Sequence, residues 1–75
     1  MTSAQCRAAR GIVNWSVRDL AENAGVHRNT VTNIETGRVE TTSETLAAIR
    51  AALEAAGVVF LPENGNGPGV ALRKA

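Results

Sequence analysis

The sequence predicts a mainly α-helical domain of four short helices that ends in a short β-hairpin. Between residues 2 and 57, apolar side chains recur at the three- and four-residue spacing of helices, and several of these stretches follow a residue that can cap a helix. After Gly57 the pattern changes to two short apolar runs separated by a segment rich in glycine, asparagine and proline. We therefore divide the chain into a helical domain, residues 1–57, and a tail, residues 58–75.

The first helix is predicted to run to about Val13, with the hydroxyl of Thr2 or Ser3 as its N-terminal cap. Asn14 follows, and asparagine tolerates the left-handed conformation in which many helices end. The face that points to the core carries small and apolar residues: Cys6, Ala9, Ile12 and Val13.

The second helix is predicted over Ser16–Asn23. The Ser16 hydroxyl can accept a backbone N–H at its start, and Asp19 can reach back to complete a capping box. Gly25 then supplies the left-handed residue that a tight turn needs. The core face carries Leu20, Ala21 and Ala24.

The third helix is predicted over His27–Thr36 and ends at Gly37. Val31 and Ile34 lie on its core face, and the opposite face carries Arg28, Asn29, Thr32 and Asn33. Two short helices that cross at a tight turn form a helix-turn-helix. The usual use of this motif is reading DNA.

The fourth helix is predicted over Glu44–Ala56, with Thr42 or Ser43 as its cap and Gly57 as its end. It is rich in alanine, the strongest helix former. Its core face carries Leu46, Ile49 and Leu53, and we expect all four helices to share one core.

The tail is interpreted as a β-hairpin. Its first strand, Val58–Leu61, is β-branched or bulky and lies between Gly57 and Pro62. A turn over Glu63–Gly69 is followed by a second apolar run, Val70–Leu72. The alternative is a flexible linker. Because the first run is apolar at every position, we expect it to be buried on both faces.

Composition and charge fit a small binding module. A chain of 75 residues forms one domain at most, and a domain of this size buries only about 60% of its unfolded surface, so oligomerisation would help its stability. The net charge of +1 is too small to indicate nucleic acid by itself, so any DNA contact must be local. A signal peptide and a run near the ~20 residues that span a bilayer are both absent from this sequence, and we expect a soluble cytoplasmic protein.

Taken together, these residues resemble the lambda-repressor-like, Cro/CI-type XRE family of phage and bacterial helix-turn-helix regulators. The resemblance covers roughly residues 4–57 and rests on the combination of Arg10, Trp15, Ser16, Leu20, Ala21, Gly25, Val26, Val31, Ile34, Glu35, Gly37 and Arg38. It implies a four-helix lambda-repressor-like domain that binds double-stranded DNA. The helix that begins near His27 would lie in the major groove as the recognition helix.

The resemblance implies base contacts from His27, Arg28, Asn29, Thr32 and Asn33. Their chemistry fits base edges, because arginine can donate two hydrogen bonds to guanine, asparagine can bridge adenine, and a threonine methyl can pack on the thymine methyl. The alternative is a solvated helix face. An exposed helix, however, rarely prefers so many short polar groups over Glu, Lys and Ala.

Phosphate contacts are expected around the start of the second helix, where free N–H groups and the helix dipole attract anions. The expected set is Ser16, Val17, Arg18, Arg38, Thr41 and Thr42. Two positions depart from the family, which commonly has glutamine in place of Val17 and serine in place of His27. The second change replaces a good helix cap with a bulky, titratable donor, so we expect an unusual operator sequence.

Other residues are interpreted as structural. Arg10 and Glu35 resemble the family's partly buried ion pair, which would orient the recognition helix. Trp15 is interpreted as a core residue rather than a ligand platform, and Cys6 as a small buried hydrophobe rather than a redox sensor.

Catalysis and metal binding find little support in the sequence. Ser16 and Asp19 are accounted for by capping, so they do not form a nucleophilic set with His27. One cysteine and one histidine cannot build a structural zinc site with sulfur and imidazole ligands. We expect no enzyme, no metal and no cofactor.

The sequence thus predicts a transcriptional regulator, most simply a dimeric repressor that occludes a promoter, its own being one candidate. By analogy only, the regulated operon is that of a mobile element or is linked to quorum sensing. Dimerisation would place two recognition helices about 34 Å apart on an inverted-repeat operator. The predicted dimer interface is the tail, through Val58, Val59, Phe60, Leu61, Val70 and Leu72. The alternative is an antitoxin-like or antiactivator-like protein whose main partner is a second protein.

Overall fold

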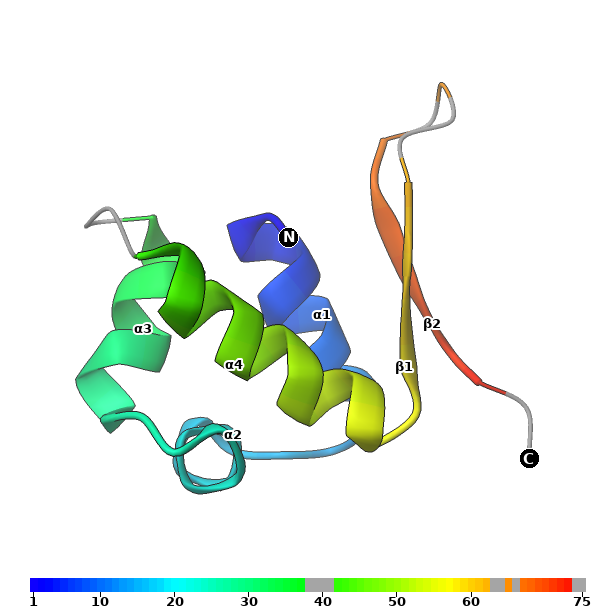
Figure 1. The fold of residues 1–75 in the computed structure, drawn as a ribbon. Helices are drawn as coiled ribbons and strands as arrows, with labels where there is room; N and C mark the ends of the chain where they lie inside the picture. Colours follow the sequence, from blue (N-terminus) through cyan, green and yellow to red (C-terminus); the bar gives the residue numbers. More distant parts are fainter. Residues whose placement is uncertain (38–41, 63–64, 66, 74–75) are drawn as a thin grey trace.

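The computed structural model describes residues 1–37, 42–62, 65 and 67–73. These form the helices α1 (Ser3–Ile12), α2 (Val17–Ala24), α3 (Arg28–Thr36) and α4 (Ser43–Ala55), followed by the strands β1 (Val58–Leu61) and β2 (Gly69–Leu72) (Figure 1). The predicted fold class, a mainly α-helical domain with a C-terminal β-hairpin, is confirmed. Within the described residues, no helix is long and apolar enough to cross a membrane.

The helices begin at residues whose side chains satisfy free N–H groups. Thr2 caps α1 and Ser16 caps α2, each in a capping box with the residue three positions later, and Thr42 caps α4. In the second box, Ser16 Oγ accepts the Asp19 N–H at 3.0 Å and Asp19 Oδ2 accepts the Ser16 N–H at 2.9 Å. Gly25, with φ of 72°, then makes the left-handed turn between α2 and α3.

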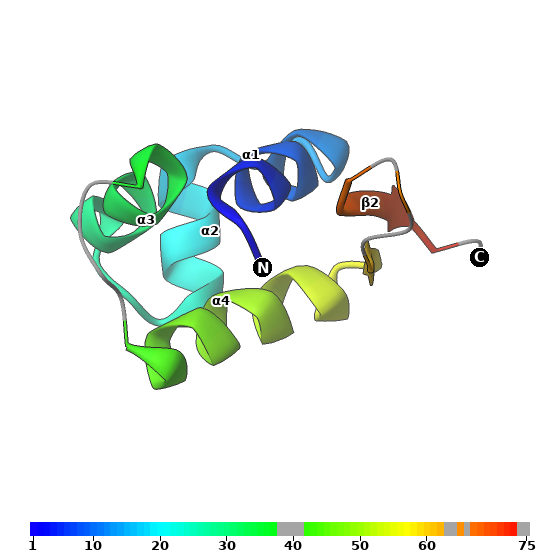
Figure 2. The same cartoon turned by 90° about the horizontal axis from the view of Figure 1, so that it is seen from above.

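The core lies where α2 meets α3 and α4 and where α1 crosses α3 (Figure 2). Its largest fully buried side chains are Leu20, Ile49, Leu53, Val31 and Cys6. Trp15 is half-buried against this core, as Val13 is.

The prediction that Ile12 lies on the core face of α1 is wrong. Its side chain is 38% exposed, because Ile12 is the last residue of α1 and lies past the part of the helix that the core covers. The chain then turns at Asn14, which has a φ of 59°, and this turn brings Val13 and Trp15 against the core instead.

The hairpin packs one face on the helices. Its antiparallel register pairs Val58 with Leu72 and Phe60 with Val70, so these residues share the face that contacts α1 and α4. Val58 is only 3% exposed. On the other face, Val59 is 39% and Leu61 42% exposed, so within one chain the apolar run of β1 is buried on one face only. The hairpin and α3 lie at opposite ends of the molecule (Figures 1 and 2).

Gln5 connects the hairpin to α1 through contacts that the helical pattern of the sequence does not predict. Its Nε2 donates to the carbonyl oxygens of Gly69, at 3.0 Å, and of Leu61, at 3.4 Å. These two residues are paired in the register of the hairpin. Its Oε1 accepts the Thr2 N–H at 2.9 Å. The spacing of Thr2 and Gln5 is that of a capping box, and this was the one feature of the sequence that indicated a structural role for Gln5.

Candidate nucleic-acid interface

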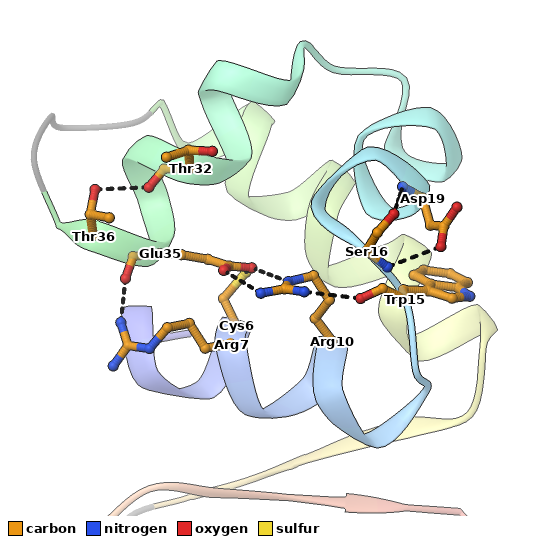
Figure 3. A network of polar contacts seen from close by, with 9 residues as sticks. All are labelled: Cys6, Arg7, Arg10, Trp15, Ser16, Asp19, Thr32, Glu35 and Thr36. Carbon is orange, nitrogen blue, oxygen red and sulfur yellow. Dashed lines mark hydrogen bonds and ion pairs between the residues drawn. The ribbon is translucent and has the colours of Figure 1, made fainter.

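The inner side of α3 is fixed to α1 by a two-pronged ion pair. Arg10 Nε lies 2.8 Å from Glu35 Oε2, and Arg10 Nη2 lies 3.0 Å from Glu35 Oε1 (Figure 3). The third Arg10 nitrogen, Nη1, donates to the Trp15 carbonyl at 3.0 Å. The Arg10 side chain is 25% exposed and that of Glu35 only 6%, so the pair is largely shielded from water and restrains how α3 can turn.

Two neighbours complete this cluster. Cys6 Sγ lies 3.7 Å from Glu35 Oε2, and Arg7 Nη1 donates to the Glu35 carbonyl oxygen (Figure 3). Burial and the adjacent Glu35 carboxylate raise the pKa of the Cys6 thiol from 9.0 to about 12, so Cys6 stays protonated and unreactive near neutral pH. The hydrogen bonds with Glu35 raise the pKa of the Arg10 guanidinium. Arg7 was missed from the sequence, although it lies one helical turn before Arg10.

The outer side of α3 is polar and open. Arg28, Asn29 and Thr32 are exposed and Asn33 is half-buried, whereas Val31, Ile34 and Glu35 are buried on the other side. Figure 3 shows Glu35 pointing from α3 toward α1, with Thr32 one turn along α3 and farther from α1. Within the described part of the chain, no hydrogen bond or ion pair engages the four polar side chains, which are those of Arg28, Asn29, Thr32 and Asn33.

His27 is the N-terminal cap of α3. Its Nδ1 accepts the Asn29 N–H at 3.1 Å, and its backbone is extended, with φ of −74° and ψ of 147°. The expectation that α3 loses a good helix cap because histidine stands in place of serine at residue 27 is therefore wrong. A neutral imidazole has one acceptor nitrogen, which can replace the serine hydroxyl. His27 as a residue is exposed.

The expected phosphate-contacting residues lie at two helix starts. At α2, the amide groups of Val17 and Arg18 have no partner among the described residues, while Ser16 is engaged in the capping box. The Arg18 side chain is exposed and pairs with Glu22, with 3.1 Å between Nε and Oε1. At α4, the exposed Thr42 already bonds to Thr45. Arg38 and Thr41 lie outside the described residues.

A hollow of about 440 Å³ separates α2 from the start of α3. It is open to solvent and is lined by residues of α2, of the turn and of the start of α3: Arg18, Ala21, Glu22, Val26, His27 and Arg28. Two of its charged groups, Arg18 and Glu22, form an ion pair across one helical turn, so that among the described residues of its lining Arg28 is the arginine without an ion-pair partner. Among the described residues, no cluster of three or more His, Cys, Asp or Glu side chains could hold a metal ion.

Two short helices crossing at a left-handed glycine, with a fixed inner side and a free polar outer side on the second helix, define a helix-turn-helix DNA-binding module. The family model described as Helix-turn-helix matches residues 7–56, which is more than half of the chain. The chain therefore belongs to this family, the lambda-repressor-like XRE regulators, and is a DNA-binding transcriptional regulator. No curated protein matches it.

Proposed function

We propose that this protein is a sequence-specific repressor that binds an inverted-repeat operator as a homodimer, with α3 in the major groove. The observation that carries the proposal is the contrast between the two sides of α3. Its inner side is fixed by Arg10 and Glu35, while its outer side presents polar side chains that have no partner in the described part of the chain. A rigid helix with free donors and acceptors is what direct readout of bases requires.

Within this proposal each polar residue of α3 has a role set by its chemistry. Arg28 donates two hydrogen bonds to guanine, and Asn29 bridges the N6 and N7 atoms of adenine. Thr32 offers its methyl group to thymine, and its neighbour Asn33 reaches bases from the half-buried edge of the helix. His27 contributes a base contact from the N-terminal cap of α3.

The start of α2 would fix the register on the DNA backbone. The free amides of Val17 and Arg18 and the positive end of the helix dipole suit a phosphate oxygen. Val17 contributes only its backbone, because its half-buried side chain packs toward the core. Ser16, Arg38, Thr41 and Thr42 belong to the same proposed set, whose contacts position the protein and carry little sequence information.

For the dimer, the proposal now centres on the outer face of the hairpin. Val58 is buried in its own chain, and Phe60 and Val70 pack on their own helices, so these three hold the hairpin in place. Val59 and Leu61 are exposed on the outer face, and Leu72, which pairs with Val58 on the inner face, is 56% exposed at the end of β2. Among the described residues neither strand has a further strand beside it, and pairing across a twofold axis would protect these edges.

A hairpin interface bears on operator geometry. The molecule is 30 Å along its longest axis, and α3 and the hairpin lie at its opposite ends. A twofold axis at the hairpin therefore separates the two recognition helices by at most about twice this length, and a separation of one turn of DNA, about 34 Å, requires the two chains to be inclined to each other.

The proposal is tested with the purified chain alone. DNA selected from a random pool should contain an inverted repeat, and a gel shift on that site should show one complex with two copies of the protein. A promoter that contains the site should be silenced in a reporter strain. If the chain binds no DNA by itself, but does so with a second protein that covers the hairpin, the alternative of an antitoxin-like or antiactivator-like function is favoured instead.

A further inference from the structure

We infer that His27 reads DNA as a hydrogen-bond donor only, through Nε2–H, and that its partner is an acceptor atom on a base edge in the major groove. The inference rests on the proposed function, because it assigns a polarity to one residue of that interface. His27 then has two roles: its Nδ1 caps the N-terminus of α3, and its Nε2 contacts DNA and contributes to specificity.

The cap contact decides which nitrogen carries the proton. Nδ1 accepts the Asn29 N–H at 3.1 Å, so Nδ1 must be free of hydrogen. In the neutral ring the proton therefore lies on Nε2. One ring carbon separates Nε2 from Nδ1, and the bond directions at the two nitrogens diverge. While the Nδ1 lone pair faces the Asn29 amide, the remaining N–H is therefore directed away from that amide, in a residue that is exposed.

The surroundings of His27 favour an acceptor-bearing partner. The hollow between α2 and α3 brings His27 next to Arg28, which has no ion-pair partner among the described residues, while the Glu22 carboxylate is already paired with Arg18. Donors therefore dominate this part of the interface. In the major groove the acceptors are the O6 and N7 atoms of guanine, the N7 atom of adenine and the O4 atom of thymine, whereas cytosine presents an amino donor.

A serine at this position would behave differently. Its hydroxyl can both donate and accept, and it is too short to reach far from the helix start. The imidazole extends farther from the helix than a serine hydroxyl. Because its Nδ1 is used by the cap, it offers only a hydrogen-bond donor and cannot pair with a donor group on a base. We therefore expect the base opposite His27 to discriminate against cytosine, in addition to whatever Arg28 and Asn29 select.

The first test needs no DNA. The chain contains one histidine, so a long-range proton–nitrogen NMR spectrum of its imidazole in mildly alkaline buffer reports His27 alone. We expect the tautomer with Nε2 protonated and Nδ1 bare. On addition of the selected operator, the Nε2–H signal should become protected from exchange with water. The opposite tautomer in the free protein would overturn the inference.

The second test separates reading from capping. His27→Ser keeps a strong cap, so its unfolding midpoint should match that of the parent chain, while His27→Ala should lose both functions. For His27→Ser we expect affinity for the selected operator to fall roughly 3- to 10-fold, the size of one neutral hydrogen bond, with no change on random DNA. One operator position should also become tolerant of cytosine.

The outcomes are distinct. An equal loss of affinity on operator and random DNA would assign the acceptor to a phosphate oxygen and overturn the base contact. Unchanged affinity on both DNAs would overturn any DNA contact by His27. If the parent chain itself fails to distinguish operator from random DNA, the proposed function fails, and the tautomer measurement still shows whether the cap geometry is as described.

Discussion

The two ends of this molecule are built alike on the inside and differently on the outside. At one end, α3 is held by buried side chains and by the Arg10–Glu35 pair, and its outer face carries charged and amide groups. At the other end, the hairpin is held by Val58 and by the two hydrogen bonds from Gln5, and its outer face carries Val59 and Leu61.

The difference shows what each end is suited to bind. A polar surface without internal partners remains well hydrated and gives up its water for a ligand with matching donors and acceptors, as DNA has. An exposed apolar face next to open strand edges gains most from another apolar surface. The comparison leads us to expect DNA at the α3 end and a second copy of the chain at the hairpin end.

The largest effect is expected at the inner side of α3. Arg10→Ala leaves the Glu35 carboxylate buried without its cation. Fully buried ion pairs that lose one partner cost about 3 to 5 kcal/mol, and because the Arg10 side chain is 25% exposed we expect the free energy of unfolding to fall by about 2 to 4 kcal/mol. Denaturant titration measures this loss, and weaker DNA binding should follow from the disturbed helix.

A double variant tests the reason for that loss. Arg10→Met combined with Glu35→Leu removes both charges, and it should be more stable than Arg10→Ala because no buried charge is left unpaired. If Arg10→Ala is fully stable and yet does not bind DNA, Arg10 is a DNA contact rather than the anchor of α3.

A second effect is expected at the outer face of the hairpin. Val59→Lys with Leu61→Lys places two charges on the proposed dimer interface, and we expect the mass in solution to fall to that of one chain, with operator affinity reduced at least 10-fold. Sedimentation and gel shift measure the two effects. The matched control adds the same charge on the exposed side of α4, as Ala47→Lys with Ala51→Lys, and should leave the mass unchanged.

Substitution is preferable here to cutting the chain after Gly57. A shortened chain would lose Val58 from the core and would leave the Gln5 amide without its two carbonyl partners. Its failure to dimerise could then reflect unfolding. If the lysine variant dimerises as well as its control does, the interface lies on the helices.

The smallest effect is a dependence of stability on alkaline pH. The folded chain holds the pKa of Cys6 at about 12, compared with 9.0 ordinarily, so the unfolded chain loses the thiol proton first. The contribution of Cys6 to stability is therefore complete below pH 9 and declines as the pH rises from 9 toward 12. Cys6→Ala should flatten that part of the stability profile, and an unchanged profile would show that the thiol is not shielded.

Sequence patterns were sufficient for the helical part because local chemistry determines it. Ser16 with Asp19 defined the start of α2, and Gly25 defined the turn, without reference to the rest of the chain. Val58–Leu61 could be recognised as a strand, but not divided into two faces. Only the packing of the helices determines that Val58 points inward and Val59 outward.

The remaining differences also depend on tertiary context. Ile12 has the spacing of a core residue but lies beyond the end of the core, and Gln5 finds its partners in strands more than fifty residues away. For the interface, the polar face of α3 could be identified from periodicity. The capping role of His27 could not, because it depends on the rotamer that brings Nδ1 to the Asn29 amide.

The central claim is that α3 reads bases, and the measurement that tests it most directly compares specific with nonspecific affinity. Arg28→Ala and Asn29→Ala remove exposed side chains from the outer face, so the fold should remain intact. We expect each to cost about 1 to 3 kcal/mol of binding free energy on the selected operator and much less on random DNA at the same salt concentration. Equal losses on both DNAs would contradict the claim and reduce these residues to phosphate contacts.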